Sequence, residues 1–252
     1  MHYYRTGGGK PAMILLHGFT DNGLCWARVA TVLEDKFDII MPDVRGHGKS
    51  LAKDLDFSLE TISEDIVNLI NTLSLEKPIL MGHSMRGQIA TLIAANHPEL
   101  TSKIILEDPA YIFNYKSFKA KFLVIIFKFM IKRNMKKTEE KLKKSSKRLN
   151  SKWDIMDHVT WAAAQKEYSL NDPMTVFENL KISVDWHETF QKINAPTLII
   201  VSTKGILRKK DADKIISEFG DAKLAIVQNA GHNIRRDNFD GFINHVKSFL
   251  DN

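Results

Sequence analysis

Cysteine and long apolar runs are both scarce in this sequence of 252 residues. Because Cys25 is the only cysteine, an internal disulfide is excluded, and such a composition is typical of a reducing compartment. The longest strongly apolar stretch, residues 122–131, is interrupted by Lys128 and is too short to span a bilayer. Residues 1–18 contain a glycine turn and lack the layout of a secretory signal. We therefore expect a cytoplasmic protein without a transmembrane segment.

Sequence patterns for metal and nucleotide binding are also lacking. No two of the nine histidines have the H-x-x-x-H spacing of a helical metal site. The glycine-rich residues 6–10 precede an apolar run, whereas a phosphate-binding loop follows one. We expect no metal and no cofactor.

The net charge of +6 is unevenly distributed along the chain. Residues 116–152 hold 14 Lys and Arg but only Glu139 and Glu140 as acidic residues, so this segment carries +12 and the rest carries −6. The plain interpretation is an amphipathic helix followed by a solvated, charged helix. The alternative is weak attraction to an anionic surface, such as lipid headgroups. Nucleic-acid binding is not expected, because only phenylalanines are interleaved with the basic residues.

Short runs of Ile, Leu and Val alternate with stretches of helical periodicity. The runs lack strict alternation, as expected for parallel strands covered on both faces. They begin at Ala12, Phe37, Lys77, Ser102, Ala195 and Lys223, and the predicted helices span 25–33, 59–73, 87–96, 210–219 and 239–250. This order predicts an α/β fold with a mostly parallel central sheet and helices on both faces. Residues 110–194 contain no convincing strand and are predicted to form a helical insertion over the ends of the strands.

Polar motifs follow the predicted strands at the edge where open parallel sheets bind ligands. They are "HGF" at residues 17–19, "DVRGHGKS" at 43–50, "GHSMRG" at 82–87 and "AGHNI" at 230–234. In this order and at these spacings they resemble the α/β-hydrolase fold family over nearly the whole chain. The resemblance implies a core domain of residues 1–109 and 195–252, with residues 110–194 as its helical cap.

Acyl transfer is the chemistry that this resemblance implies. A serine hydroxyl is a poor nucleophile unless a neighbouring base takes its proton. The resemblance makes Ser84 the nucleophile and His232 the base, which later protonates the leaving group. It carries the oxyanion hole onto the backbone N–H groups of Phe19 and Met85. Haloalkane dehalogenases and epoxide hydrolases of this fold have Asp at the nucleophile position, so Ser84 points toward esters and lactones instead.

The acid of the predicted triad stands at an unusual place. The commonest family position follows the strand at residues 197–201, but no carboxylate occurs there before Asp211, which is expected to start the next helix. Some family members carry the acid after the preceding strand, where this chain has Asp108, with Glu107 beside it. The order Ser84, Asp108, His232 keeps the family order of nucleophile, acid and base. The alternative is that Asp108 only caps a turn before Pro109.

The second departure is Arg86, at the place of the second glycine in the family pattern G-x-S-x-G. The turn is tight, so a side chain at this position is expected to crowd the backbone. Three interpretations stay open. The arginine stem runs to an open surface with its guanidinium in water; or Arg86 pairs with a carboxylate of the pocket; or the turn is damaged and the protein binds without turnover.

The sequence therefore predicts a serine hydrolase, a carboxylic-ester hydrolase acting on a small or medium ester or lactone through an acyl-enzyme. The competing prediction is a catalytically impaired, ligand-binding protein of the same fold. His17 and His47 are expected to be structural, and His83 to point away from the pocket. Candidates to line an apolar acyl pocket are Phe122, Phe127, Trp153 and Trp161.

Overall fold

The computed structural model describes residues 1–50, 52, 55–111, 118–167, 175–176, 179 and 184–251, without the side chains of residues 118–124 and 127. The strands are β1 (Tyr3–Arg5), β2 (Ala12–Leu16), β3 (Asp38–Pro42), β4 (Ile79–His83), β5 (Ile104–Glu107), β6 (Thr197–Ser202) and β7 (Ala222–Val227). The α-helices are α1 (Ala27–Leu33), α2 (Leu59–Thr72), α3 (Met85–Asn96), α4 (Phe118–Met135), α5 (Glu139–Leu149), α6 (Ile155–Ala164), α8 (Trp186–Gln191), α9 (Lys209–Ile216), α10 (Ile234–Asp237) and α11 (Phe239–Leu250). Short 3₁₀ helices are η1 (Gly23–Trp26) and η2 (Pro98–Leu100).

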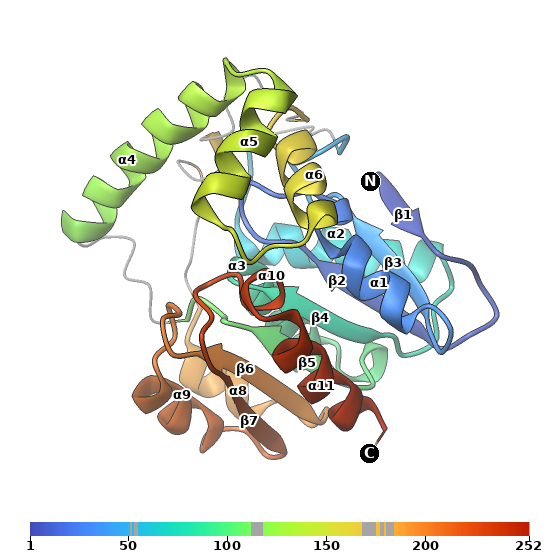
Figure 1. Ribbon diagram of the computed structural model, residues 1–252. Helices are drawn as coiled ribbons and strands as arrows, with labels where there is room; N and C mark the ends of the chain where they lie inside the picture. The colour runs from blue at the N-terminus through green and yellow to red at the C-terminus, as the bar shows by residue number, and fades with distance from the viewer. Residues whose placement is uncertain are drawn as a thin grey trace.

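A single seven-stranded sheet runs through the molecule in the order β1-β3-β2-β4-β5-β6-β7 (Figure 1). All neighbouring strands are parallel except β1, which pairs antiparallel with β3 at one edge. The predicted fold class and the six predicted strands are confirmed. Strand β1 was not predicted, because this edge strand of three residues is too short to show a periodic pattern.

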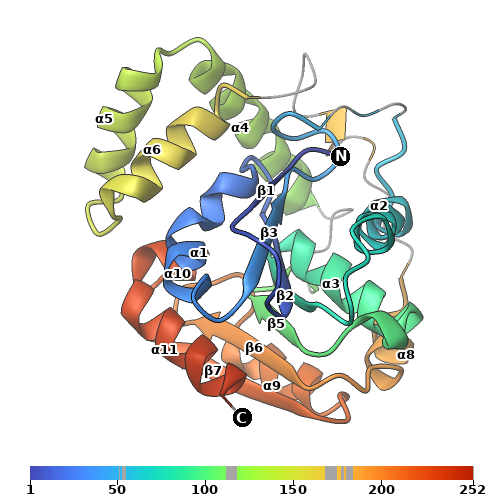
Figure 2. The same cartoon turned by 90° about the vertical axis from the view of Figure 1, so that its right-hand side faces the viewer.

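Helices cover both faces of the sheet, with α2, α3 and α8 on one side and α1 and α11 on the other (Figure 2). The side chains of each strand alternate between the two layers: Ile14 and Leu16 of β2 belong to one core cluster, and Met13 and Leu15 to the other. Both faces are therefore dry, which explains the unbroken apolar runs in the sequence.

Helix α2 illustrates how local sequence sets these elements. It begins after Ser58, whose side-chain oxygen accepts a hydrogen bond from the backbone N–H of Thr61. Ile62, Ile66 and Ile70 recur every four residues, so they share one face and are buried. The helix thereby covers the sheet with that face.

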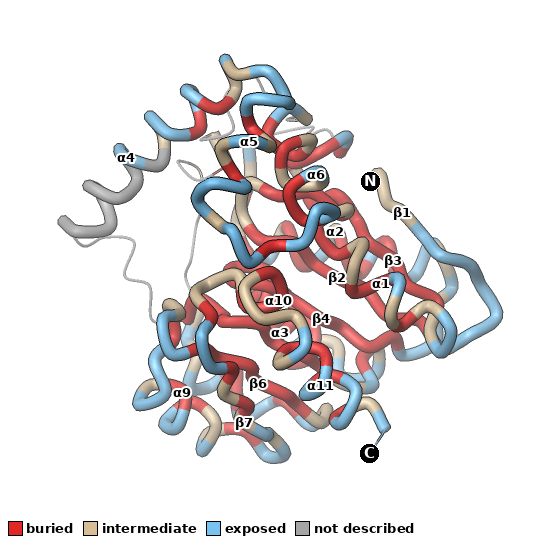
Figure 3. The backbone as a smooth tube through the Cα atoms, in the orientation of Figure 1, coloured by how far each residue is buried: buried red, intermediate tan, exposed pale blue. Residues whose placement is uncertain are grey.

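The segment between β5 and β6 carries α4, α5, α6 and α8. Helices α5 and α6 pack together above the sheet, and α4 runs away from them (Figure 1), while much of the outer surface of α5 is exposed (Figure 3). Helix α8 packs on α3 instead. We propose that α4, α5 and α6 form the predicted cap; the boundaries 110–194 remain a prediction. Among the described helices, none combines the length and hydrophobicity needed to cross a membrane.

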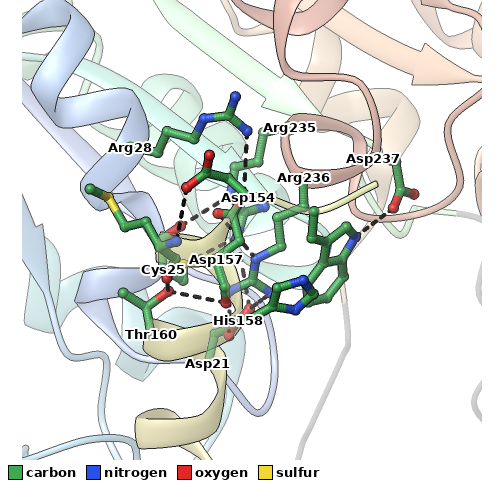
Figure 4. A network of polar contacts seen from close by, with 12 residues as sticks. Asp21, Cys25, Arg28, Asp154, Asp157, His158, Thr160, Arg235, Arg236 and Asp237 are labelled. Carbon is green, nitrogen blue, oxygen red and sulfur yellow. Dashed lines mark hydrogen bonds and ion pairs between the residues drawn. The ribbon is translucent and has the colours of Figure 1, made fainter. Parts of the chain in front are cut away.

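Buried ion pairs attach α6 to the sheet domain (Figure 4). Arg236 of α10 donates two hydrogen bonds to the carboxylate of Asp21, at 3.1 and 3.0 Å. Its Nε lies 3.9 Å from Asp157 of α6, which Arg28 also approaches at 3.5 Å. Burial raises the pKa of Asp157, and the guanidinium groups of Arg236, Arg235 and Arg28 oppose that rise. The contact between core and insertion therefore depends on compensated buried charge.

Arg236→Met should lower the free energy of unfolding by about 3–5 kcal/mol, since the Asp21 carboxylate would stay buried without its bidentate partner. Urea unfolding measures this change. Lys36→Met, which breaks the exposed pair with Asp251, is the matched control and should cost less than about 1 kcal/mol. Equal effects of the two substitutions would contradict this account of the contact.

Candidate active site

Ser84 lies in the turn between β4 and α3, at the carboxyl edge of the sheet. Its backbone has φ 57° and ψ −124°, a conformation that residues with a Cβ rarely adopt. The turn is held because the Ser84 N–H donates to Glu107 O at 2.9 Å and the Ser84 carbonyl accepts from Gly87 N at 3.0 Å. A Cβ on Gly82 would lie 2.3 Å from the carbonyl oxygen of Arg86, so this position requires glycine. The local geometry is a strained strand–turn–helix with serine at its apex.

Asp108 follows β5, the strand beside β4, and its carboxylate contacts His232. The Nδ1 atom of His232 lies 2.6 Å from Asp108 Oδ2. The same carboxylate accepts hydrogen bonds from the backbone N–H groups of Ile206 (2.8 Å) and Leu207 (2.9 Å), and it is fully buried. A hydrogen bond from Nδ1–H to the carboxylate leaves Nε2 of His232 free of a proton, as a base requires. The His232 side chain is 30% exposed.

The neighbouring carboxylates have other partners. Glu107 points to the opposite side of the strand, where its carboxylate accepts from the backbone N–H and Nη1 of Arg235 at 2.9 and 2.7 Å. Burial raises the pKa of Glu107, and Arg235 opposes the rise. Asp211 lies in the first turn of α9, as expected. The structure therefore brings Asp108, and not Glu107, to His232.

The loop after β2 contains Phe19, the first predicted oxyanion donor. His17 is fully buried, accepts from the Val44 N–H through Nε2 (3.0 Å) and donates from Nδ1–H to Gly18 O (2.8 Å). Burial, with the Arg86 charge as a second cause, lowers the pKa of His17 to about 3. The second predicted donor, Met85, is the first residue of α3, where backbone N–H groups have no acceptor within the helix.

His83 connects the two loops that flank Ser84. Its Nε2 donates to the His232 carbonyl oxygen at 3.0 Å, and the two rings lie 4.5 Å apart. A Cβ on Gly18 would lie 2.5 Å from His83 Nδ1, so the ring rests directly against the loop backbone. Burial is the main cause that lowers the pKa of His83. The neutral His83 ring therefore packs between the loop of Gly18 and the loop of His232.

The first interpretation of Arg86, a guanidinium in water, is wrong because this side chain is fully buried. Its Nη2 lies 3.4 Å from His47 Nδ1. Helix α3 still begins directly after Ser84, and a Cβ on Gly87 would meet Pro109 Cβ at 3.0 Å. The arginine is accommodated because its side chain runs inward and is buried against His47, while the turn itself is kept.

Two contacts from the insertion reach the site loops and were missed in the sequence. Gln165, at the end of α6, donates to the carbonyl oxygen of Thr20 at 3.0 Å. Trp153 donates from Nε1 to Asp237 at 2.7 Å, and the other carboxylate oxygen accepts from Gly231 N, next to His232. No local sequence signal identifies these partners, because they are far apart in the chain.

The structure describes the side chains of two of the four predicted pocket residues, Trp153 and Trp161. Trp153 is buried, with His158 stacked at 5.9 Å and the Arg236 guanidinium 4.8 Å from its ring centre. Trp161 is partly exposed on α6. The side chains of Phe122 and Phe127 lie outside the described residues. A pocket lined by these four residues stays a prediction.

No group of three or more His, Cys, Asp and Glu side chains that could bind a metal is present in the described ranges. Burial raises the pKa of the Cys25 thiol to about 12, so Cys25, to which Arg235 donates at 3.1 Å, stays protonated. The contact of His232 with Asp108 lies at the same edge of the sheet as the turn of Ser84.

The fold and this arrangement define an α/β hydrolase. Residues 11–237 match the family model of the alpha/beta hydrolase fold, and the chain belongs to this family.

Several relatives align over almost the whole chain. N-formylmaleamate deformylase of Pseudomonas putida is 28% identical over 99% of this chain and 92% of its own length. A putative esterase/lipase of Haemophilus influenzae is 25% identical over 99% of this chain and 86% of its own. The crystal structure of N-formylmaleamic acid deformylase from Pseudomonas putida S16 superposes with a TM-score of 0.80 at 25% identity, covering 98% of this chain and 95% of that one. The relatives are hydrolases.

Gly205→Ala should destabilise the protein by about 1–3 kcal/mol, the usual cost of forcing extra volume into a packed site. A Cβ on Gly205 would lie 2.6 Å from both carboxylate oxygens of Asp108, so the carboxylate would have to move from His232. Gly220→Ala is the control, because its Cβ would meet only Ile193 O, at 3.8 Å. Urea unfolding compares the two; an equal cost would refute the close packing of Gly205 on Asp108.

Proposed function

We propose that this protein is a serine hydrolase that cleaves a small or medium carboxylic ester or lactone through an acyl-enzyme. The observation that carries the proposal is the contact between His232 Nδ1 and the buried Asp108 carboxylate, 2.6 Å long, beside the strained turn of Ser84. That contact orients the imidazole and stabilises the imidazolium that forms when the serine proton is taken up.

The reaction proceeds in two halves. His232 Nε2 removes the Ser84 proton as the oxygen attacks the carbonyl carbon, and the N–H groups of Phe19 and Met85 hold the resulting oxyanion. The imidazolium then gives its proton to the leaving alcohol as the C–O bond breaks. Water, deprotonated by the same imidazole, attacks the acyl-enzyme and releases the acid and the free serine. Each half returns His232 to its neutral form.

A small amide is a second candidate substrate. The relative named N-formylmaleamate deformylase aligns over 99% of this chain, and its name indicates cleavage of an N-formyl group. The same triad serves an amide when the imidazolium protonates the departing nitrogen. Comparing the rates of esters, lactones and N-formyl amides at equal concentration separates the two classes.

Intact-mass labelling with a fluorophosphonate probe tests the nucleophile without knowledge of the substrate. Wild-type protein should gain one adduct, Ser84→Ala should gain none, and His232→Ala should react several orders of magnitude more slowly, because its serine lacks a base. The controls Ser217→Ala and His245→Ala change exposed residues and should label at the wild-type rate.

An unlabelled but folded wild-type protein would disprove the proposal. The alternative of a catalytically impaired, ligand-binding protein would then take its place. A single adduct on a residue other than Ser84 would disprove the assignment of the nucleophile.

We further propose a weak contact of α4 and α5 with an anionic membrane surface. Ile125 and Phe129 of α4 are 65% and 71% exposed, one turn apart, and Lys132 and Arg133 follow on the exposed surface. Helix α5 adds further basic residues to the +12 segment of residues 116–152. Exposed apolar side chains among basic ones favour the headgroup region of anionic lipid.

Flotation with phosphatidylcholine vesicles, with and without phosphatidylglycerol, measures this contact. Binding should require phosphatidylglycerol and decrease with salt, because screening weakens the attraction of the basic residues. Phe129→Ser should weaken it several-fold, whereas Leu55→Ser, a change of an exposed leucine in the other part of the chain, should not. Binding that ignores lipid charge and salt, or no binding, would exclude the proposed surface.

A further inference from the structure

We infer that Arg86 is a positioning residue for the oxyanion loop: through its buried contact with His47 it holds residues 17–19 in the geometry that receives the developing oxyanion. This inference rests on the proposed function. Arg86 is the residue that departs from the family pattern, and the inference gives it a role in catalysis. It predicts that Arg86 supports turnover, whereas a damaged turn would prevent it.

Arg86 contacts His47 in the interior of the protein. The guanidinium is completely buried, with Nη2 3.4 Å from His47 Nδ1. The same Nδ1 lies 3.1 Å from the Arg45 carbonyl oxygen, so it donates to that oxygen in one tautomer and accepts from Arg86 in the other. In both tautomers Arg86 packs against the His47 ring.

His47 in turn contacts two residues of the loop, Phe19 and His17. Its ring lies edge-on to Phe19, with 5.6 Å between ring centres, and 5.2 Å from the ring of His17. Aromatic rings at these separations and angles attract one another and transmit displacement, because the interior is close-packed. A shift of His47 into space vacated by Arg86 would move both residues.

The hydrogen bonds of His17 set the direction of the Phe19 N–H. His17 donates from Nδ1–H to Gly18 O at 2.8 Å, while its Nε2 accepts from Val44 N at 3.0 Å. The Gly18 carbonyl and the Phe19 N–H belong to one planar trans peptide and point to opposite sides. Holding the carbonyl therefore aims the Phe19 N–H.

Charge acts in the same direction as packing. His17 accepts the Val44 N–H only in its neutral form, since both nitrogens of a protonated ring are donors. Burial first, and the positive charge of Arg86 second, lower the pKa values of both His17 and His47. The cation thus favours the neutral His17 ring that the loop geometry requires.

The test compares wild-type protein with Arg86→Met, Arg86→Lys and Arg86→Gly. The readouts are kcat and KM for p-nitrophenyl acetate and the inhibition constant of phenylboronic acid. Boron accepts the Ser84 oxygen, the proton passes to His232, and the tetrahedral adduct places an oxygen in the oxyanion hole.

Arg86→Met should lower kcat about 10- to 100-fold, less than the full loss of a donor, while KM changes by less than about threefold. Boronate binding should weaken by the same factor as kcat/KM, because both report the tetrahedral geometry. Arg86→Lys should recover part of the loss, and Arg86→Gly should resemble Arg86→Met or be slower. A merely structural role would lower stability without this parallel between kcat and boronate affinity.

Arg28→Met is the control, since it removes a guanidinium from the contact with Asp157 and not from the loop. For this variant, the ratio of the phenylboronic acid inhibition constant to KM should equal that of the wild type. Faster turnover in Arg86→Gly, or unchanged kcat in Arg86→Met, would overturn the inference while Ser84-dependent turnover upholds the proposed function. A wild-type protein with no Ser84-dependent turnover or labelling would overturn both.

Discussion

The buried carboxylate of Asp108 is the group on which the arrangement of the site depends. Its two oxygens accept three hydrogen bonds, from His232 Nδ1 and from the backbone N–H groups of Ile206 and Leu207. A carboxylate without water needs such donors, because its burial is otherwise very costly. The loop after β6 therefore encloses the carboxylate of the residue that follows β5. The orientation of His232 and the closure of this edge of the sheet depend on the same two oxygens.

The end of β5 explains why Glu107 and Asp108 have different partners. Glu107 is the last residue of the strand, whereas Asp108 follows it with a φ of 42°, in the left-handed region. Glu107 therefore meets Arg235, whose guanidinium also lies 4.1 Å from the ring centre of Trp26, while Asp108 meets His232. Buried ion pairs of this kind add little net stability, but they tolerate few alternative arrangements. The pair of Glu107 and Arg235 fixes α10 just after the loop that carries His232, so it contributes to the site through geometry.

The sequence was informative wherever a pattern is local. Unbroken apolar runs predicted six strands, and the positions of Ser84, Asp108 and His232 after those strands placed them at one edge. The partners of Arg236, Gln165 and Trp153 could not be predicted, because each contact joins segments that only the tertiary structure brings together. The prediction that Arg86 reaches water was wrong for the same reason: a long basic side chain usually reaches water, and only the tertiary contact with His47 shows that this one is buried.

The geometry of the turn explains why it accepts arginine where the family pattern has glycine. The close approach in the turn is between Gly82 and the Arg86 carbonyl oxygen, so it constrains the side chain at position 82 and the backbone, not the side chain, at position 86. The side chain at position 86 is instead buried against His47. Glycine there would remove this side chain from a close-packed interior, and the neighbouring groups would have to rearrange. Arg86 is therefore compatible with the strained backbone conformation of Ser84.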